Sequence, residues 1–120
     1  MRSIDLELET KPAGDWTVLA VGGEVDLNTA PQLKERINAL IAQGHSRIVV
    51  DLESVGFMDS TGLGELIGYL QKFEDRQRKM ALVKPSHRIL ALLKITKLDT
   101  VFKIFDARET AMEYLTDHAA

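Results

Sequence analysis

One short stretch, residues 57–64 (FMDSTGLG, here called the serine loop), places side chains that can do chemistry next to one another. Ser60 has a carboxylate before it, Asp59, and a second hydroxyl after it, Thr61. The apolar run RIVVDL precedes this stretch and the helical pattern LGELIGYLQKF follows it, so the serine lies at the predicted start of a helix. A serine there can cap the helix, act as a nucleophile, or accept a phosphate.

The cap and the phosphate acceptor are compatible roles. Either Asp59 or Ser60 can cap the helix, and Gly62 allows the first turn to pack closely. A helix N-terminus exposes N–H groups that lack intrahelical partners, and it carries about half a positive charge. It therefore favours a phosphate on a nearby hydroxyl.

The surrounding residues give the nucleophile role less support. A nucleophile elbow requires G-x-S-x-G, but Met58 stands two positions before Ser60. The histidines are scattered, at His45, His87 and His118, and no spacing places one beside the serine. No GK[ST] follows the glycines, which excludes a P-loop, and DSTG has no second copy that would complete an aspartic-protease pair. We therefore expect no enzymatic activity, no metal site and no cofactor.

The composition predicts one ordinary globular domain over residues 1–120. The chain is 45% apolar and 28% charged, has a net charge of -3 and contains no cysteine. This charge gives no basic field that would attract nucleic acid or an anionic membrane. The first ten residues, MRSIDLELET, do not resemble a signal peptide, and no apolar run has the length of a membrane span. We expect a soluble cytoplasmic protein.

The first half of the chain predicts a hairpin, a helix and a buried strand. Residues 4–8 and 16–21 are expected strands, joined by a turn at 11–15. A helix then starts near Thr29, which has capping-box spacing to Gln32, and Gly44 is placed to end it. The strand RIVVDL (47–52) shows too little alternation for a half-exposed strand and is expected to be buried on both faces.

The second half continues the alternation of helices and strands. The helix after the serine loop has one apolar face, formed by Leu63, Leu66, Ile67, Leu70 and Phe73. A strand at 80–84 leads to a helix capped by Ser86, and a short strand at 101–105 leads to a last helix, where Asp106 and Glu109 have cap spacing. This order predicts a single α/β domain, in which a mixed, largely parallel sheet of about four to five strands packs with about four helices.

Two loops are expected to meet at one edge of that sheet. Loops that leave the carboxyl ends of parallel strands form the binding edge of such folds. The serine loop leaves the strand RIVVDL there, and the loop GGEVDLNT, which follows the second strand, is expected to reach the same edge.

Three segments of the chain resemble STAS domains, and specifically bacterial anti-sigma factor antagonists. GEVDLNTAPQL is similar to the family's G-E-hydrophobic-D-x-x-T-A-P-x-L segment, and IVVDLESVGFMDSTGLGELI to its strand–D-S-[ST]-G-L-G–helix segment. LVKPSHRILALLKITKLDTVFKIF contains a match to the family's third helix. The resemblance covers nearly the full length. The chain departs from the usual pattern at Thr61, where many relatives carry serine, and at Val25, where leucine is usual.

The resemblance implies a switch that is not an enzyme. In the family the first hydroxyl residue after the aspartate is phosphorylated, and that position matches Ser60, with Thr61 as the alternative. The unphosphorylated protein binds a GHKL-type serine kinase that is also the anti-sigma factor, and a PP2C-type serine phosphatase resets the phosphorylated form. The oligomeric state is expected to be a monomer or a weak dimer.

The expected partner surface combines the two loops. Its residues are Met58, Asp59, Ser60, Thr61, Gly62 and Leu63 from the serine loop, with Glu24, Asp26, Asn28 and Thr29 from its neighbour. Each has a structural alternative, since Asn28 and Thr29 can be caps and Met58 and Leu63 can be core. Asp26 is the strongest candidate outside the serine loop, because no structural task for it is evident from the sequence.

Two other functions remain open at this point. A STAS module can be a subunit of a transporter or lipid-trafficking system, in which the serine is structural or a simple contact. A small serine hydrolase is the third alternative, which a serine-reactive probe would test.

Overall fold

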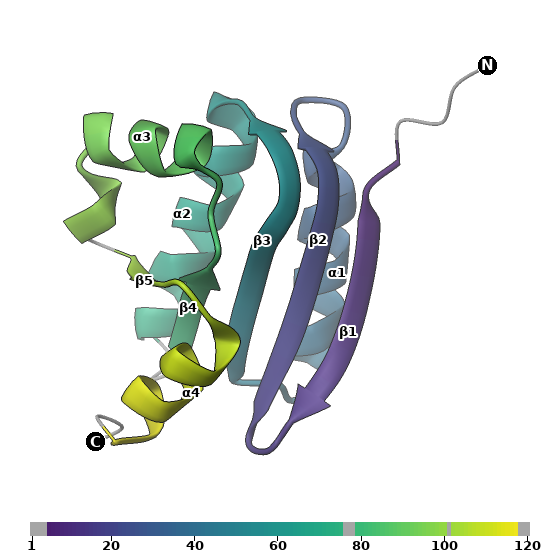
Figure 1. Ribbon diagram of the computed structural model, residues 1–120. Coiled ribbons are helices and arrows are strands. Elements are labelled where there is room, and N and C mark those ends of the chain that lie inside the picture. The colour runs from purple at the N-terminus through teal and green to yellow at the C-terminus, as the bar shows by residue number, and fades with distance from the viewer. Residues whose placement is uncertain (1–4, 76–78, 101, 118–120) are drawn as a thin grey trace.

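The computed structural model describes residues 5–75, 79–100 and 102–117 (Figure 1). Their five strands form a single sheet in the order β1-β2-β3-β4-β5, in which β1 is antiparallel to β2 and all other neighbours are parallel. This confirms the predicted α/β fold with a largely parallel sheet. Along the chain the elements are β1 (Glu7–Ala13), β2 (Trp16–Val25), α1 (Ala30–Ala42), β3 (Arg47–Met58), α2 (Ser60–Asp75), β4 (Lys79–Val83), α3 (His87–Ile95), the 3-10 helix η1 (Leu98–Thr100), β5 (Lys103–Phe105) and α4 (Arg108–Asp117).

The sheet carries an apolar core on each face. On one face Leu19, Val50 and Leu82, from the three central strands, are buried in a core that also includes residues of α1, α2 and α3. On the other face Trp16 and Val49 pack in a smaller core with α4. Figure 1 shows α1 and α2 behind the sheet and α4 in front of it. Because helices cover both faces, residues 48–52 of β3 are all buried, as the sequence predicts.

The N-terminal hairpin is tighter than predicted. The strand expected at 4–8 runs from Glu7 to Ala13, with residue 4 outside the described residues, and the turn shrinks to Gly14 and Asp15. Gly14 has a φ of 62°, a conformation that favours glycine in a two-residue turn. Pro12 is tolerated within the strand because β1 lies at the edge of the sheet, where a missing N–H breaks no ladder bond.

The capping box predicted for α1 is wrong. The Thr29 hydroxyl donates to the Glu24 carbonyl at 2.6 Å instead of accepting from the helix. The Gln32 side chain reaches the residue just before β1, where its Oε1 accepts the Leu6 N–H at 2.7 Å. The predicted end of the helix is confirmed: Gly44, at a φ of 93°, donates to the Ile41 carbonyl, and the following residue closes a Schellman motif.

The later elements follow the prediction with local differences. Ser86 caps α3 as expected, and its Oγ accepts the Ile89 N–H at 3.2 Å. The last helix begins at Arg108, so Ala107 precedes it and the predicted Asp106 cap lies one residue too early. Strand β3 extends six residues beyond the predicted end at 52 and reaches Met58, which carries the chain directly to the serine loop.

Candidate functional site

The serine loop and the β2–α1 loop (residues 26–29) start from neighbouring positions at one edge of the sheet. Val25 ends β2 and Met58 ends β3, and the two residues are paired across the parallel strands. The Asp59 N–H continues this pairing by donating to the Val25 carbonyl at 3.0 Å. The prediction that the two loops share one surface is therefore confirmed.

Asp59 is the residue that caps α2. Its Oδ1 accepts the N–H groups of Thr61 at 2.9 Å and Gly62 at 3.0 Å, which are unpaired donors of the first turn. Its carbonyl accepts the Leu63 N–H at 3.0 Å. Ser60 is the first residue of the helix and is exposed to solvent. The Ser60 hydroxyl is thus not needed to start α2.

The same carboxylate also holds the neighbouring loop. Asp59 Oδ2 accepts the Leu27 N–H at 3.2 Å, so one side chain joins the start of α2 to the β2–α1 loop. The relative position of the two loops therefore depends on Asp59. The serine loop and the β2–α1 loop are therefore held together as one surface around Ser60.

Gly62 allows α2 to start this close to β2. A Cβ at this position would lie 2.5 Å from Val25 Cγ1 and 2.9 Å from the Val25 carbonyl oxygen. Both distances are below normal contact, and the second involves backbone, which cannot rotate away. A larger residue would displace the first turn, and Ser60 with it. The close packing expected at Gly62 is confirmed.

Asp26 has a structural task that the sequence did not reveal. Its Oδ1 accepts the N–H groups of Asn28 at 2.9 Å and Thr29 at 3.0 Å, and its carbonyl accepts the Ala30 N–H at 2.8 Å. Its own N–H donates to the Thr29 hydroxyl at 3.0 Å. Asp26 therefore organises the turn that leads into α1, and its half-exposed carboxylate remains part of the surface.

The predicted partner residues divide into a surface and its support. Glu24, Asn28 and Ser60 are exposed, and Asp26, Asp59 and Thr61 are half-buried. The other four are buried: Met58 and Leu63 belong to the core, Thr29 is enclosed by its loop, and Gly62 packs against Val25. Met58 also lines a hollow beside α3, and contact of these four residues with a partner stays a prediction.

Sequence reasoning missed the apolar part of this edge. Among the described residues the large hydrophobic side chains classed as exposed are Leu27 at 70%, Phe57 at 39% and Ile95 at 81%. Phe57 and Ile95 line one hollow together with Arg88 of α3. An apolar residue inside the otherwise polar stretch DLNT was a signal that could have identified Leu27.

No histidine is positioned to support a serine nucleophile in the described structure. His45 follows α1 at the other end of the strands from Ser60. Its Nδ1 lies 2.7 Å from the hydroxyl of Thr17, near the start of β2. His87 is exposed at the start of α3, and His118 lies outside the described residues. The described residues also contain no group of three acidic or histidine side chains that could hold a metal ion.

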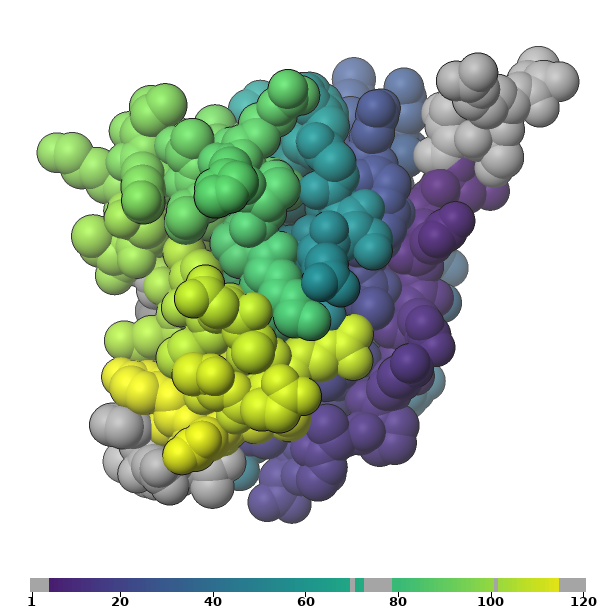
Figure 2. Space-filling view, in the orientation of Figure 1, coloured from purple at the N-terminus to yellow at the C-terminus, as the bar shows by residue number. Residues whose placement is uncertain are grey.

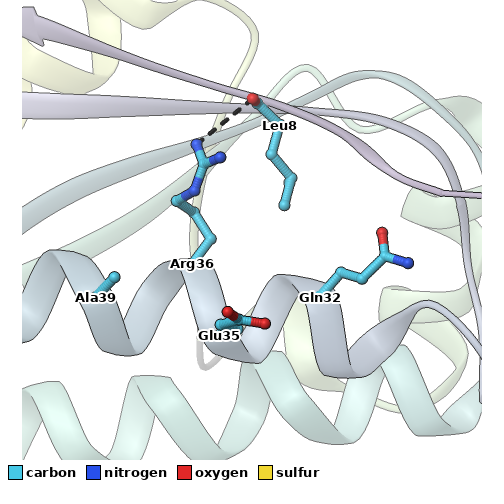
Figure 3. Close-up of a pocket in the computed structure, with 5 residues that line it drawn as sticks. All are labelled: Leu8, Gln32, Glu35, Arg36 and Ala39. Atoms are coloured by element: carbon cyan, nitrogen blue, oxygen red, sulfur yellow. Dashed lines mark hydrogen bonds between the residues drawn. The ribbon is translucent and has the colours of Figure 1, made fainter.

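A second hollow lies between the edge strand β1 and α1 (Figure 3). Arg36 points from α1 toward the strand, and its Nη1 donates to the Leu8 carbonyl at 3.4 Å and to Thr10 Oγ1 at 3.1 Å. Gln32, one turn earlier, binds the Leu6 N–H. These side chains attach α1 to the outer backbone of β1 and of the residue before it. We therefore assign the side chains of this hollow a structural role.

Comparison with known proteins identifies the family. A sequence model of the STAS domain matches residues 7–111, which is most of the chain. The chain belongs to the STAS domain family. This STAS domain is 33% identical to the anti-sigma-B factor antagonist of Staphylococcus aureus over 106 residues, which cover 88% of this chain and 98% of that protein.

Solved structures agree with this assignment. An anti-sigma factor antagonist from Mycobacterium paratuberculosis superimposes on the STAS domain with a TM-score of 0.81 at 25% identity, covering 92% of this chain and 94% of that one. The murine anion transporter Slc26a9 gives a TM-score of 0.77 at 12% identity, covering 90% of this chain and 19% of that one. The transporter shares the fold alone. Neither antagonist is named as an enzyme, which agrees with the expectation for this chain.

Within the part of the chain that the structure describes, no helix has the length and apolar character needed to cross a membrane.

Proposed function

We propose that this STAS domain is an anti-sigma factor antagonist that is switched off by phosphorylation of Ser60. In the proposed cycle the unphosphorylated chain binds a GHKL-type serine kinase that is also the anti-sigma factor, and a sigma factor is released. The kinase phosphorylates Ser60, the chain dissociates, and a PP2C-type serine phosphatase restores the hydroxyl. The cycle takes place in the cytoplasm, with the chain as a monomer or weak dimer. The name of the Staphylococcus aureus relative supports the antagonist role.

The observation that carries this proposal is the separation of Ser60 from the helix cap. The Ser60 side chain is exposed at the first residue of α2, while Asp59 makes the capping bonds. A phosphate on Ser60 therefore removes no bond that the fold requires. Thr61 is half-buried, which supports Ser60 as the modified residue.

The switch is electrostatic and local. Phosphorylation adds about 1.5 to 2 negative charges next to the Asp59 carboxylate. The N-terminus of α2 stabilises part of this charge within the chain, so the fold persists with little rearrangement. A partner surface that fits the neutral hydroxyl must instead desolvate a dianion. A hundredfold loss of affinity corresponds to about 2.7 kcal/mol, which one badly placed charge at a dry interface can supply.

A capture experiment tests the switch. Wild type, Ser60→Ala and Ser60→Asp are used as baits in lysate of the native organism, with and without Mg-ATP, and bound proteins are identified by mass spectrometry. We expect wild type and Ser60→Ala to bind a GHKL-type serine kinase and Ser60→Asp to lose it by about a hundredfold in affinity. Intact mass should show one phosphate on wild type and none on Ser60→Ala.

The matched control is Ser46→Asp, which adds the same charge at another exposed serine. Ser46 lies immediately before β3, at the opposite end of this strand from Ser60. This variant should bind like wild type. Equal capture of membrane transporter subunits by all variants, with no phosphate on wild type, would contradict the proposal and favour a transporter-associated module.

A further inference from the structure

An apolar groove lies between the end of β3 and helix α3, beside the serine loop. Phe57 lines one side of it, and Arg88, Ala91, Leu92 and Ile95 of α3 line the other. The α3 residues recur at the spacing of a single helical face. Figure 2 shows the atoms of α3 next to those of β3 and the start of α2 at the top of the molecule.

Two large apolar side chains of this groove are unusually exposed for their type. Ile95 is 81% exposed and Phe57 39%, and with Leu27 they are the large hydrophobic residues classed as exposed in the described structure. Single exposed apolar residues are common, but their concentration at one edge indicates a surface that another molecule covers. Met58, the last residue of β3, also lines the groove, so the groove begins where the serine loop leaves the sheet.

The groove is also locally basic. Residues 85–97 (PSHRILALLKITK), which include α3, contain Arg88, Lys94 and Lys97 and no acidic residue, whereas Lys84 just before them is paired with Glu53 at 3.6 Å. Arg88 itself lines the groove. A complementary surface therefore presents an apolar side chain surrounded by carboxylates. The net charge of -3 on the whole chain disfavours an anionic membrane as the occupant.

We propose that this groove receives an apolar side chain from an acidic surface of the same kinase-type partner that docks on Ser60, which rests on the function proposed above. The interface then has two halves. The Ser60 half reports phosphorylation, and the α3 half supplies affinity that phosphorylation does not change. The contacts of the α3 half contribute the same free energy in the bound complex and in the transition state of phosphoryl transfer. They therefore change the affinity for the kinase and not the rate of the chemical step.

Charge variants of the groove test this proposal against the kinase that wild type captures, purified and measured by calorimetry. Ile95→Asp and Arg88→Glu should each weaken binding about tenfold or more, because each places an acid against an acidic partner. In phosphorylation assays both variants should raise the KM for the chain by a similar factor and leave kcat within about twofold. The control, Lys11→Glu, changes charge at an exposed position of β1 and should change neither.

Ile95 and Arg88 are exposed, so both variants should fold, which circular dichroism and thermal unfolding verify. Unchanged affinity and KM in both would overturn the groove proposal, while loss of binding in Ser60→Asp would still support the switch. Failure of wild type to capture a kinase would instead refute the proposed function, and with it this partner.

A photo-crosslinking residue at position 95 distinguishes a protein from a membrane as the occupant. An adduct with the captured kinase supports the proposal. An adduct with lipid only, together with binding to vesicles of phosphatidylglycerol that Arg88→Glu abolishes, would overturn it in favour of a membrane surface.

Discussion

Asp59 caps α2, and this assignment decides what Ser60 is able to do. The carboxylate accepts the N–H groups of Thr61 and Gly62 in its own helix and of Leu27 in the neighbouring loop. If Ser60 capped the helix, its phosphorylation would disturb the first turn. Because Asp59 does so, modification of Ser60 changes the charge of the surface and leaves its framework in place.

At the same scale, two glycines of α2 should respond in opposite ways to alanine. Gly62→Ala places a Cβ against the Val25 backbone, so we expect a loss of about 1–3 kcal/mol in the free energy of unfolding. Gly64→Ala meets nothing within 4 Å and should stabilise the helix by about 0.5–1 kcal/mol. Urea denaturation measures both. Equal effects of the two substitutions would show that close packing at Gly62 is unimportant.

Between elements, Tyr69 joins α2 to α1. Its side chain is 2% exposed, and its hydroxyl lies 3.0 Å from the Lys34 carbonyl and 2.8 Å from Asn38 Oδ1. Burial, reinforced by the charge of Glu65, raises the pKa of Tyr69 to about 12. The folded protein therefore holds the neutral phenol more strongly than the unfolded chain does.

This gives a pH dependence with a defined sign. The unfolded pKa of tyrosine is about 10, so the stabilisation from Tyr69 is fully present below pH 10 and is lost as the pH rises toward about 12. Tyr69→Phe should cost about 1 kcal/mol at neutral pH through the lost hydrogen bond. It should also remove this part of the alkaline loss in stability. Parallel curves of wild type and Tyr69→Phe between pH 9 and pH 12, in chemical denaturation, would contradict the assignment.

Elements whose signals are local were predicted well from the sequence. The alternation of helices and strands, the glycine that ends α1 and the Ser86 cap depend on nearby residues, and all three are confirmed. Thr29 and Gln32 have the spacing of a capping box, yet the Thr29 hydroxyl binds the nearby Glu24 carbonyl. The Gln32 side chain binds the N–H of Leu6, which only the folded chain brings near. Long-range partners of this kind leave no periodic signal.

The candidate site shows the same limit. The position of Ser60 at the start of a helix, and the meeting of the two loops, followed from the order of strands and helices. The structural task of Asp26 and the exposure of Leu27 and Ile95 did not, because they depend on how loops close and which helix face stays uncovered. The type of a residue alone does not determine whether another element will bury its side chain.

For the molecule as a whole, the core beneath α4 is separate from the end of the sheet that carries Ser60. The face that carries α4 is held by an ion pair in which Arg108 Nε donates to Asp51 Oδ2 at 2.7 Å, with Asp51 only 3% exposed. Trp16, the single tryptophan of the chain, packs in the same core as Ala111 of α4. Stability of this face can therefore be changed, and observed by fluorescence, away from the Ser60 edge.

Arg108→Ala should lower the free energy of unfolding by about 1–3 kcal/mol, because it leaves a buried carboxylate without its charged partner. Trp16 fluorescence should shift to the red as α4 loosens, while kinase binding per folded molecule stays unchanged. Arg47→Ala is the control: its pair with Asp15 is exposed and 4.0 Å long, so the loss should be less than about 1 kcal/mol. An unshifted Trp16 spectrum in Arg108→Ala would show that the ion pair does not hold the helix.

The outer side of β1 has a consequence for how copies of this protein meet. Pro12 offers no N–H there, and Gln32 and Arg36 already occupy backbone groups of Leu6 and Leu8. An approaching strand would have to displace an amide and a guanidinium before it could add to the sheet. At high concentration the fold is thereby protected against the addition of further strands along β1.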